Sequence, residues 1–254
     1  MVCFDRVADI YDATRRPVRP EVVEALAEEL SDCSSVLDLG VGTGRLAVPL
    51  VERGLAVVGV DLSRRMMEQA RAKGVADVMV GDISRLPFRA KSVDAVLAMH
   101  VLHLVKDPAA VLAQARATAR KKLVSIVERY EPPSQGITYA YRRALKSRGL
   151  VSASRWEQPE LGLADVVQPR RFEALVRYRE QLNAEVELKM LENRIWSTTW
   201  DVPDDVHRAV LAELSREFAG RTRTYDCEVC LLSWGVTDLT DAALAEVASA
   251  LDLS

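Results

Sequence analysis

Three glycines at every second residue, directly after a strand-like segment, constrain the fold of this chain more than any other feature. Residues 35–39 have the composition of a buried strand, and Gly40, Gly42 and Gly44 follow before a helical pattern begins at about residue 45. Glycine permits a tight turn here, and its missing Cβ lets a ligand lie against the backbone. A strand, a glycine turn and a helix in this order predict a βαβ unit that holds a nucleotide at the turn.

The spacing of the glycines and a neighbouring acid indicate which nucleotide the turn holds. The dinucleotide motif G-x-G-x-x-G needs a glycine at position 45, where this chain has Arg45. Asp38 lies at the end of the strand, and its carboxylate would repel a pyrophosphate but attract an ammonium or another cationic group. These two residues predict a nucleoside that carries positive charge. They make an NAD-dependent dehydrogenase the weaker alternative.

Strands and helices alternate regularly along the first half of the chain. The patterns predict helices at residues 20–31, 45–53, 63–73 and 107–118, and strands at 35–39, 56–60, 77–80, 93–99 and 123–127. Such alternation predicts right-handed βαβ crossovers and a doubly wound, Rossmann-like parallel sheet of the α/β class.

The pattern changes after residue 130. Here we expect helices at 137–148, 169–181, 203–219 and 240–251, and strands at 184–190 and 224–234. The two late strands predict an antiparallel pair at the edge of a seven-stranded, mostly parallel sheet. With 254 residues, 49% of them hydrophobic, the chain is long enough for a single domain over residues 1–254. Residues 1–20 and about 130–183, with 191–220 as a further candidate, are expected to form a helical lid and the acceptor pocket.

Charge and hydropathy argue against nucleic acids and membranes as partners. The formal net charge is −3, so we expect no DNA partner. Arg142, Arg143, Lys146 and Arg148 are expected on a solvated helix face. No apolar run approaches the about 18 residues of a membrane span, and the N-terminus lacks the apolar stretch of a signal peptide. These features predict a cytoplasmic protein, and they leave the oligomeric state open.

The cysteines and one histidine are expected to be structural. Cys227 and Cys230 have the spacing of a redox or zinc motif, but they lie in a strand-like run where residues three apart point to opposite faces. No second pair of Cys or His lies nearby in the sequence, so we expect buried thiols and no metal site. His207 lies in a helical pattern and is expected at the surface.

Acids follow the next two predicted strands as well. Asp61 comes 23 residues after Asp38, where a carboxylate can accept both ribose hydroxyls, and Asp82 follows Gly81 at the end of the third strand. The alternative for Asp61 is a cap on the next helix, although Ser63 already suits that role. The alternative for Asp82 is an ordinary turn residue.

Together these motifs resemble the class I S-adenosylmethionine-dependent methyltransferases. The resemblance covers about residues 5–128, and within the family it is greatest to the small-molecule branch of the ubiquinone/menaquinone-biosynthesis type. The matching segments, in order, are Asp38-x-Gly40-x-Gly42-x-Gly44, Val58-Gly59-Val60-Asp61-Leu62-Ser63, Gly81-Asp82, Leu86-Pro87-Phe88, Asp94-Ala95-Val96 and Pro108.

The resemblance implies a role for each residue on the adenosine side of the cofactor S-adenosyl-L-methionine. Asp61 would accept the ribose hydroxyls, and Leu62 would pack on the adenine. Asp82 would bind the adenine amine, and the backbone N–H of Ile83 would donate to a ring nitrogen.

On the methionine side, the resemblance implies that Asp38 binds the ammonium and that the backbone of the three glycines lies along the chain of the amino acid. Met99 and His100 would lie along the methionine near the sulfonium. Near the N-terminus, Tyr11-Asp12 and Arg16-Pro17 resemble a segment that such enzymes fold over the cofactor. Tyr11 would then approach the methyl-transfer zone, and Arg16 the cofactor carboxylate. The alternative is a frayed N-terminal helix.

Methyl transfer from a sulfonium is governed chiefly by positioning, and a general base is needed only where the acceptor must lose a proton early. His100, His103 and Tyr11 are the candidates for such a catalytic role by location. A structural or cofactor-contacting role is the more common one for such histidines. Strand four lacks the Asp/Asn-Pro-Pro-aromatic motif that follows it in amino-methylating enzymes, which argues against DNA bases as acceptors.

The acceptor itself has no recognisable signature. The aromatic residues outside the nucleotide half could line an apolar pocket or pack a lid; they are Tyr139, Tyr141, Trp156, Trp196 and Trp200. We therefore expect methyl transfer to O, N or C of a small molecule. The alternatives are a non-catalytic S-adenosylmethionine-binding module, and a protein or RNA methyltransferase whose basic helix faces an acidic acceptor.

Overall fold

The computed structural model describes residues 3–131, 136–150 and 159–252, and in it the chain divides into two compact units. Unit 1 comprises Met1–Val127, Trp156–Val176 and Val229–Ser254, and unit 2 comprises Glu128–Arg155 and Arg177–Glu228. Each unit is described by itself below.

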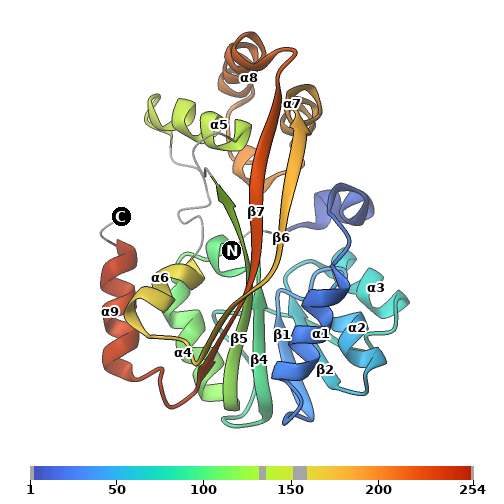
Figure 1. The fold of residues 1–254 in the computed structure, drawn as a ribbon, viewed down its shortest axis with the longest axis vertical. Helices are drawn as coiled ribbons and strands as arrows, with labels where there is room; N and C mark the ends of the chain where they lie inside the picture. Colours follow the sequence, from blue (N-terminus) through green and yellow to red (C-terminus); the bar gives the residue numbers. More distant parts are fainter. Residues whose placement is uncertain (1–2, 132–135, 151–158, 253–254) are drawn as a thin grey trace. The chain divides into compact units, whose positions relative to one another are not determined.

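One seven-stranded sheet has the order β3-β2-β1-β4-β5-β7-β6. The strands are β1 (Ser35–Leu39), β2 (Ala56–Asp61), β3 (Asp77–Val80), β4 (Val93–Met99), β5 (Ala119–Glu131), β6 (Arg171–Asn183) and β7 (Thr222–Gly235). The first five strands run parallel to one another, and β7 and β6 form an antiparallel pair at the edge (Figure 1). The predicted doubly wound, mostly parallel α/β sheet is confirmed.

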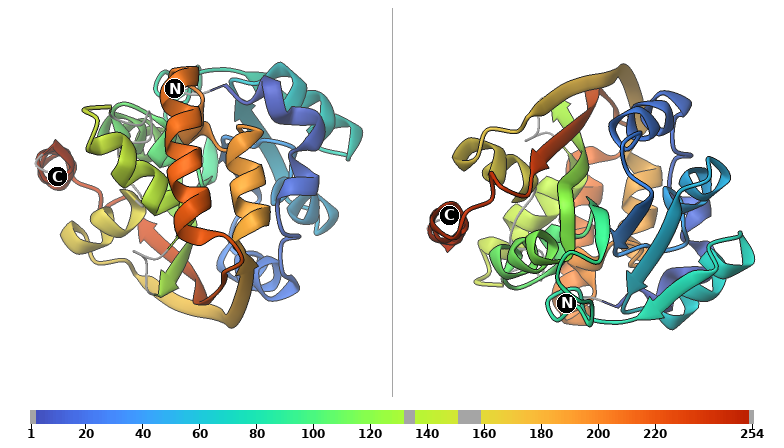
Figure 2. Two further views of the ribbon diagram at one scale, coloured as in Figure 1. Left: turned by 90° about the horizontal axis from the view of Figure 1, so that it is seen from above. Right: turned by 90° about the horizontal axis from the view of Figure 1, so that it is seen from below.

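In the described part of unit 1, helices cover both faces of the sheet. On one face lie α1 (Pro20–Glu29), α2 (Ala47–Glu52) and α3 (Arg64–Ala72); on the other lie α4 (Pro108–Thr118), α6 (Pro159–Val166) and α9 (Asp241–Asp252) (Figures 1 and 2). Four of the five residues of β1 are buried, as expected of a strand covered on both faces. Because the strands are parallel, their carboxyl ends share one edge of the sheet, and the predicted ligand acids lie there.

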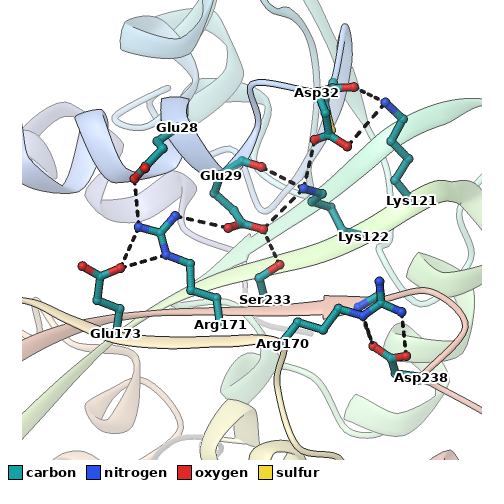
Figure 3. A network of polar contacts seen from close by, with 12 residues as sticks. Glu28, Glu29, Asp32, Lys121, Lys122, Arg170, Arg171, Glu173, Ser233 and Asp238 are labelled. Atoms are coloured by element: carbon teal, nitrogen blue, oxygen red, sulfur yellow. Dashed lines mark hydrogen bonds and ion pairs between the residues drawn. The ribbon is translucent and has the colours of Figure 1, made fainter.

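At the amino edge, a polar network ties α1 to the sheet (Figure 3). Glu29 accepts hydrogen bonds from Lys122 of β5 (3.4 Å), Ser233 of β7 (2.6 Å) and Arg171 of β6 (3.2 Å). Arg171 also pairs with Glu28. These contacts fix the edge of the sheet that lies opposite the candidate site.

Unit 2 has a core of its own, formed by α5 (Ile137–Lys146), α7 (Ala184–Glu192) and α8 (Asp204–Phe218). The predictions of a helix at 169–181 and a strand at 184–190 are wrong, because these residues form β6 and α7. Asn183 caps α7 by accepting a hydrogen bond from the N–H of Glu185 (2.8 Å). Two arginines of β6 pair with acids of β7: Arg177 with Glu228 (2.6 Å) and Arg179 with Asp226 (2.8 Å). This long-range pairing identifies the segment as a strand.

A histidine expected at the surface and a tyrosine whose place was left open lie in the core of unit 2. His207, expected at the surface, is 4% exposed, and its Nδ1 lies 2.6 Å from the hydroxyl of Tyr141, which is fully buried. Tyr141 therefore belongs to this core. Trp156 lies outside the described residues. Cys227 and Cys230 are buried, as expected, and no helix in the described part of the chain is long and apolar enough to cross a membrane.

Candidate functional site

The glycine loop after β1 leaves room for a ligand at only one of its three glycines. Gly40, Gly42 and Gly44 all have positive φ, of 69°, 55° and 80°. A Cβ on Gly40 would lie 2.5 Å from Val101, and one on Gly44 would crowd side chains at 3.2–3.3 Å. A Cβ on Gly42 would have one neighbour, the carbonyl oxygen of Gly40 at 3.8 Å. Two glycines therefore serve close packing, and Gly42 is the one that faces open space.

Backbone hydrogen bonds join this loop to the end of β2. The N–H groups of Gly40 and Val41 both donate to the carbonyl of Val60, at 2.8 and 3.1 Å. The N–H of Gly42 donates to Oδ2 of Asp61 at 2.9 Å. The carboxylate expected to bind the ribose is thus held by the same loop that is expected to bind the methionine.

Asp61 and Ser63 have separate roles at the start of α3. Ser63 caps the helix by accepting a hydrogen bond from the N–H of Met66 (3.1 Å), as expected. Asp61 accepts the N–H of Ser63 through Oδ1 (2.8 Å). Burial raises the pKa of Asp61, and the hydrogen bonds from Ser63 and Gly42 oppose that shift. Each carboxylate oxygen has a second lone pair with which it can accept a further donor.

Asp38 is a buried carboxyl that makes no hydrogen bond or ion pair with any other described residue. It is 4% exposed and lies beside Gly59 of β2 and Leu97 of β4 in the sheet register. Burial, and then the charge of Asp61, raise its pKa to about 8. A buried acid without a partner is costly unless a cation completes it, so its surroundings fit a ligand ammonium.

Asp82 forms a turn and keeps one oxygen available. Its Oδ1 accepts hydrogen bonds from the N–H and the hydroxyl of Ser84, at 2.8 and 2.7 Å, and these bonds lower its pKa. Gly81 ties this end of β3 to β2 by donating to the carbonyl of Asp61 (2.9 Å). Asp82 therefore does act as a turn residue, and its Oδ2 takes no part in the turn.

The end of β4 is bent by an unusual residue. His100 is exposed and has φ of 52°, a left-handed conformation that is uncommon for a residue other than glycine. This bend brings Val101 against Gly40. His103 lies in the short helix η3 (Leu102–Leu104), which His100 precedes, so the two histidines do not share a helix. Met99, half-buried, ends β4.

The N-terminal segment packs against the rest of unit 1. It contains the short helices η1 (Asp5–Ile10) and η2 (Asp12–Thr14), with Tyr11 between them. The Tyr11 ring packs edge-on against Phe4 at 5.9 Å, and the guanidinium of Arg15 lies 4.6 Å from its centre.

Beside the glycine loop this segment borders an open cavity of about 230 Å³, lined by Asp12, Arg15, Arg16, Pro17, Val18 and Arg45. Three arginines around one cavity suit a carboxylate or another anion. Arg45 also donates to the carbonyl of Arg16, 29 positions away. No local pattern assigned a role to Arg15, Arg45 or Asp12, because their proximity depends on segments that are distant along the chain.

Comparison with known proteins identifies the kind of domain that contains this site. Residues 37–122 match the family model described as a methyltransferase domain. The matched residues form a methyltransferase domain. The cofactor implied by this domain is S-adenosyl-L-methionine, and the open space at Gly42 and the carboxyl of Asp38, which has no partner among the described residues, fit its cationic amino-acid moiety.

Curated relatives of this methyltransferase domain cover part of the chain. An uncharacterized methyltransferase of Mycobacterium tuberculosis is 39% identical over 107 residues, which are 42% of this chain and 43% of the relative. A demethylmenaquinone methyltransferase of Thermotoga maritima is 31% identical over 145 residues, which are 53% of this chain and 62% of the relative. The chain thus spans about half the length of the curated relatives it matches.

Solved structures share the fold. A candidate methyltransferase of Bacillus halodurans superimposes with a TM-score of 0.56 at 17% identity, over 84% of this chain and 98% of that one. A phosphoethanolamine N-methyltransferase of Haemonchus contortus, in complex with S-adenosylhomocysteine, superimposes with a TM-score of 0.50 at 16% identity, over 91% of this chain and 57% of that one. At these identities the likeness concerns the fold.

Proposed function

We propose that the protein transfers the methyl group of S-adenosylmethionine to an O, N or C atom of a small-molecule acceptor. The observation that carries the proposal is the buried carboxyl of Asp38, without a partner among the described residues, beside the open face of Gly42. Asp61 and Asp82 stand at the ends of the next two strands along the sheet. A cationic amino acid joined to adenosine satisfies all three carboxylates.

The roles of the adenosine-side residues follow from the oxygens that the fold leaves available. Asp61 binds the ribose hydroxyls with the lone pairs not used by Gly42 and Ser63, and Leu62 packs on the adenine. Asp82 binds the adenine amine through Oδ2, and Ile83 donates its N–H to a ring nitrogen.

On the methionine side, Asp38 binds the ammonium and the glycine loop lies along the backbone of the amino acid. Met99 lies near the sulfonium. Arg16, in the arginine-lined cavity, binds the carboxylate, and the lining of that cavity supports this assignment. Tyr11 covers the methyl-transfer zone.

The chemistry requires the chain to orient the donor and to exclude water. S-adenosylmethionine supplies an electrophilic methyl group when bound, and in-line approach of the acceptor completes the displacement. Where the acceptor must lose a proton, His100, His103 and Tyr11 are our candidates to receive it. The prediction that residues 1–20 and about 130–183 line the acceptor pocket stays a prediction, as does the cytoplasmic location.

Two measurements test the proposal. Calorimetry should show binding of S-adenosylmethionine and S-adenosylhomocysteine but not of NAD. Incubation with S-adenosylmethionine labelled in the methyl group and with a metabolite extract should then transfer label to a small-molecule fraction. Binding without transfer to any fraction would favour the non-catalytic module, and label in protein or RNA would favour the macromolecular alternative. Failure to bind the cofactor would overturn the proposal.

A further inference from the structure

Among the contacts of the N-terminal segment with the rest of unit 1, two lie at either side of the candidate cofactor site. At the first point, Oδ1 of Asp5 accepts hydrogen bonds from the hydroxyl of Ser63 (2.5 Å) and the N–H of Arg65 (3.2 Å). These donors open α3, directly after Asp61. This first contact therefore lies on the ribose side.

At the second point, Asp12 binds the glycine loop itself. Its Oδ1 accepts a hydrogen bond from the hydroxyl of Thr43 at 2.6 Å, and its Oδ2 pairs with the ammonium of Lys73 at the end of α3. Lys73 also donates to the carbonyl of Thr43 at 3.1 Å. Thr43 stands between Gly42 and Gly44 and is 1% exposed. One carboxylate and one ammonium thus clasp the middle of the loop.

This clasp matters because a loop of alternating glycines has little stiffness of its own. Glycine loses more conformational freedom on ordering than any other residue, so the left-handed shape at Gly42 needs support from outside the loop. Burial raises the pKa of Asp12, but the hydrogen bonds from Lys73 and Thr43 lower it by more. The pKa of Asp12 is therefore below its ordinary value. The carboxylate is therefore charged at neutral pH and accepts strong hydrogen bonds.

We propose that Asp12 is a positioning residue that holds the glycine loop in its cofactor-binding shape through Thr43. Lys73 neutralises the carboxylate of Asp12, so this carboxylate does not repel an anionic group in the neighbouring arginine-lined cavity. Cofactor affinity then depends on docking of the N-terminal segment, through a residue that acts by way of the loop. This inference rests on the proposed function, since it concerns the same cofactor site.

The test combines Asp12→Ala, Thr43→Val and the double variant, with S-adenosylhomocysteine binding measured by calorimetry. The Asp12 side chain is 41% exposed, which limits the energy of its bonds. We therefore expect each single variant to weaken binding about tenfold, the equivalent of about 1.4 kcal/mol. The double variant should be no weaker than either single one, because both remove the same bond. Thr43→Ser, which keeps the hydroxyl, should restore the affinity of the native chain.

Asp9→Asn is the matched control. Asp9 lies in the same N-terminal segment as Asp12, but it pairs with Arg65 of α3 and not with the glycine loop. It should bind within about twofold of the native chain. As an independent readout, amide hydrogen exchange at residues 40–45 should speed up in Asp12→Ala and Thr43→Val without a matching change in β4 or β5. If Asp12→Ala does not fold, Thr43→Val and Thr43→Ser carry the test.

Native affinity in both single variants, additive losses in the double variant, or unchanged exchange in the loop would each overturn the inference. Failure of the native chain to bind any adenosyl ligand would instead overturn the proposed function. The exchange measurement needs no ligand, so it separates the two failures.

Discussion

The two units of this protein differ in the interactions that stabilise each of them internally, although strands β5, β6 and β7 run through both. Unit 1 has a large apolar core between sheet and helices in addition to the polar network at its amino edge, and its three strand-end acids have no ion-pair partner among the described residues. Unit 2 places paired polar groups inside its core, among them Arg223 with Glu187 and Tyr141 with His207. Strand-end acids without a cationic partner thus indicate binding in unit 1, whereas the buried pairs of unit 2 indicate internal structure.

The strongest effect is predicted for the ion pair of unit 2. Arg223 and Glu187 have side chains only 11% and 9% exposed, and they meet at 2.6 Å. Glu187→Ala would leave the guanidinium buried without its carboxylate, at a cost of about 3–5 kcal/mol in the free energy of unfolding. Denaturant unfolding followed by hydrogen exchange should show unit 2 opening before unit 1. The double variant Glu187→Leu, Arg223→Met should recover most of the loss, and simultaneous loss of both units would contradict the division.

Next in size is the loss of Asp61 in unit 1. Asp61→Ala removes the acceptor that we propose for the ribose hydroxyls and leaves the N–H groups of Gly42 and Ser63 without theirs. We expect cofactor binding to weaken by about 1–3 kcal/mol. Calorimetry measures it, and Asp226→Ala is the control, since Asp226 is an exposed partner of Arg179 in unit 2. Unchanged affinity in Asp61→Ala would refute the assignment.

The pH dependence of binding tests the role assigned to Asp38. Its pKa of about 8 means that the carboxyl is protonated at neutral pH in the free protein. An ammonium favours the ionised form, so cofactor affinity should rise as pH increases from 6 to 8, by up to about tenfold per unit. In Asp38→Asn this slope should vanish and affinity should be lower.

Protein stability should respond to Asp38→Asn in the opposite direction. A raised pKa in the folded state means that the folded native chain loses stability as pH rises from about 4 through 8. The variant lacks that loss, so at pH 9 it should be the more stable of the two by thermal unfolding. A native chain with flat stability over this range would show that Asp38 is ionised in the free protein.

A smaller pH effect is expected in unit 2. Burial lowers the pKa of His207, and the charge of Arg194 adds to that shift. The unfolded chain then binds a proton more readily than the folded one, so unit 2 should lose stability as pH falls below about 6.5. Thermal unfolding between pH 7 and 5 measures this loss, and His207→Gln should flatten it. Cofactor affinity above pH 6.5 should be the same in both proteins.

The sequence was informative where local pattern and tertiary environment agree. The strands of unit 1 are short apolar runs buried on both faces, and the acids that follow them are placed at one edge by the parallel topology alone. The local pattern is therefore enough to group Asp38, Asp61 and Asp82. Ser63 as the cap of α3 follows from the same local logic.

Where contacts between distant residues determine the structure, the predictions from sequence were wrong or could not be made. Residues 169–181 have a helical polar pattern, yet most of them belong to the edge strand β6, where Arg177 and Arg179 pair with acids of β7. His207 has the surroundings of a surface residue in its helix, yet Tyr141, 66 residues away, draws it into the core.

The parallel sheet, the glycine turn and the three strand-end acids thus follow from the sequence alone, because each depends on residues close along the chain. The tertiary structure was needed to decide which glycine faces open space, that Asp12 binds Thr43 across 31 positions, and that His207 pairs with Tyr141 in the core of unit 2. These features depend on contacts between distant segments, whose partners leave no periodic trace in the chain.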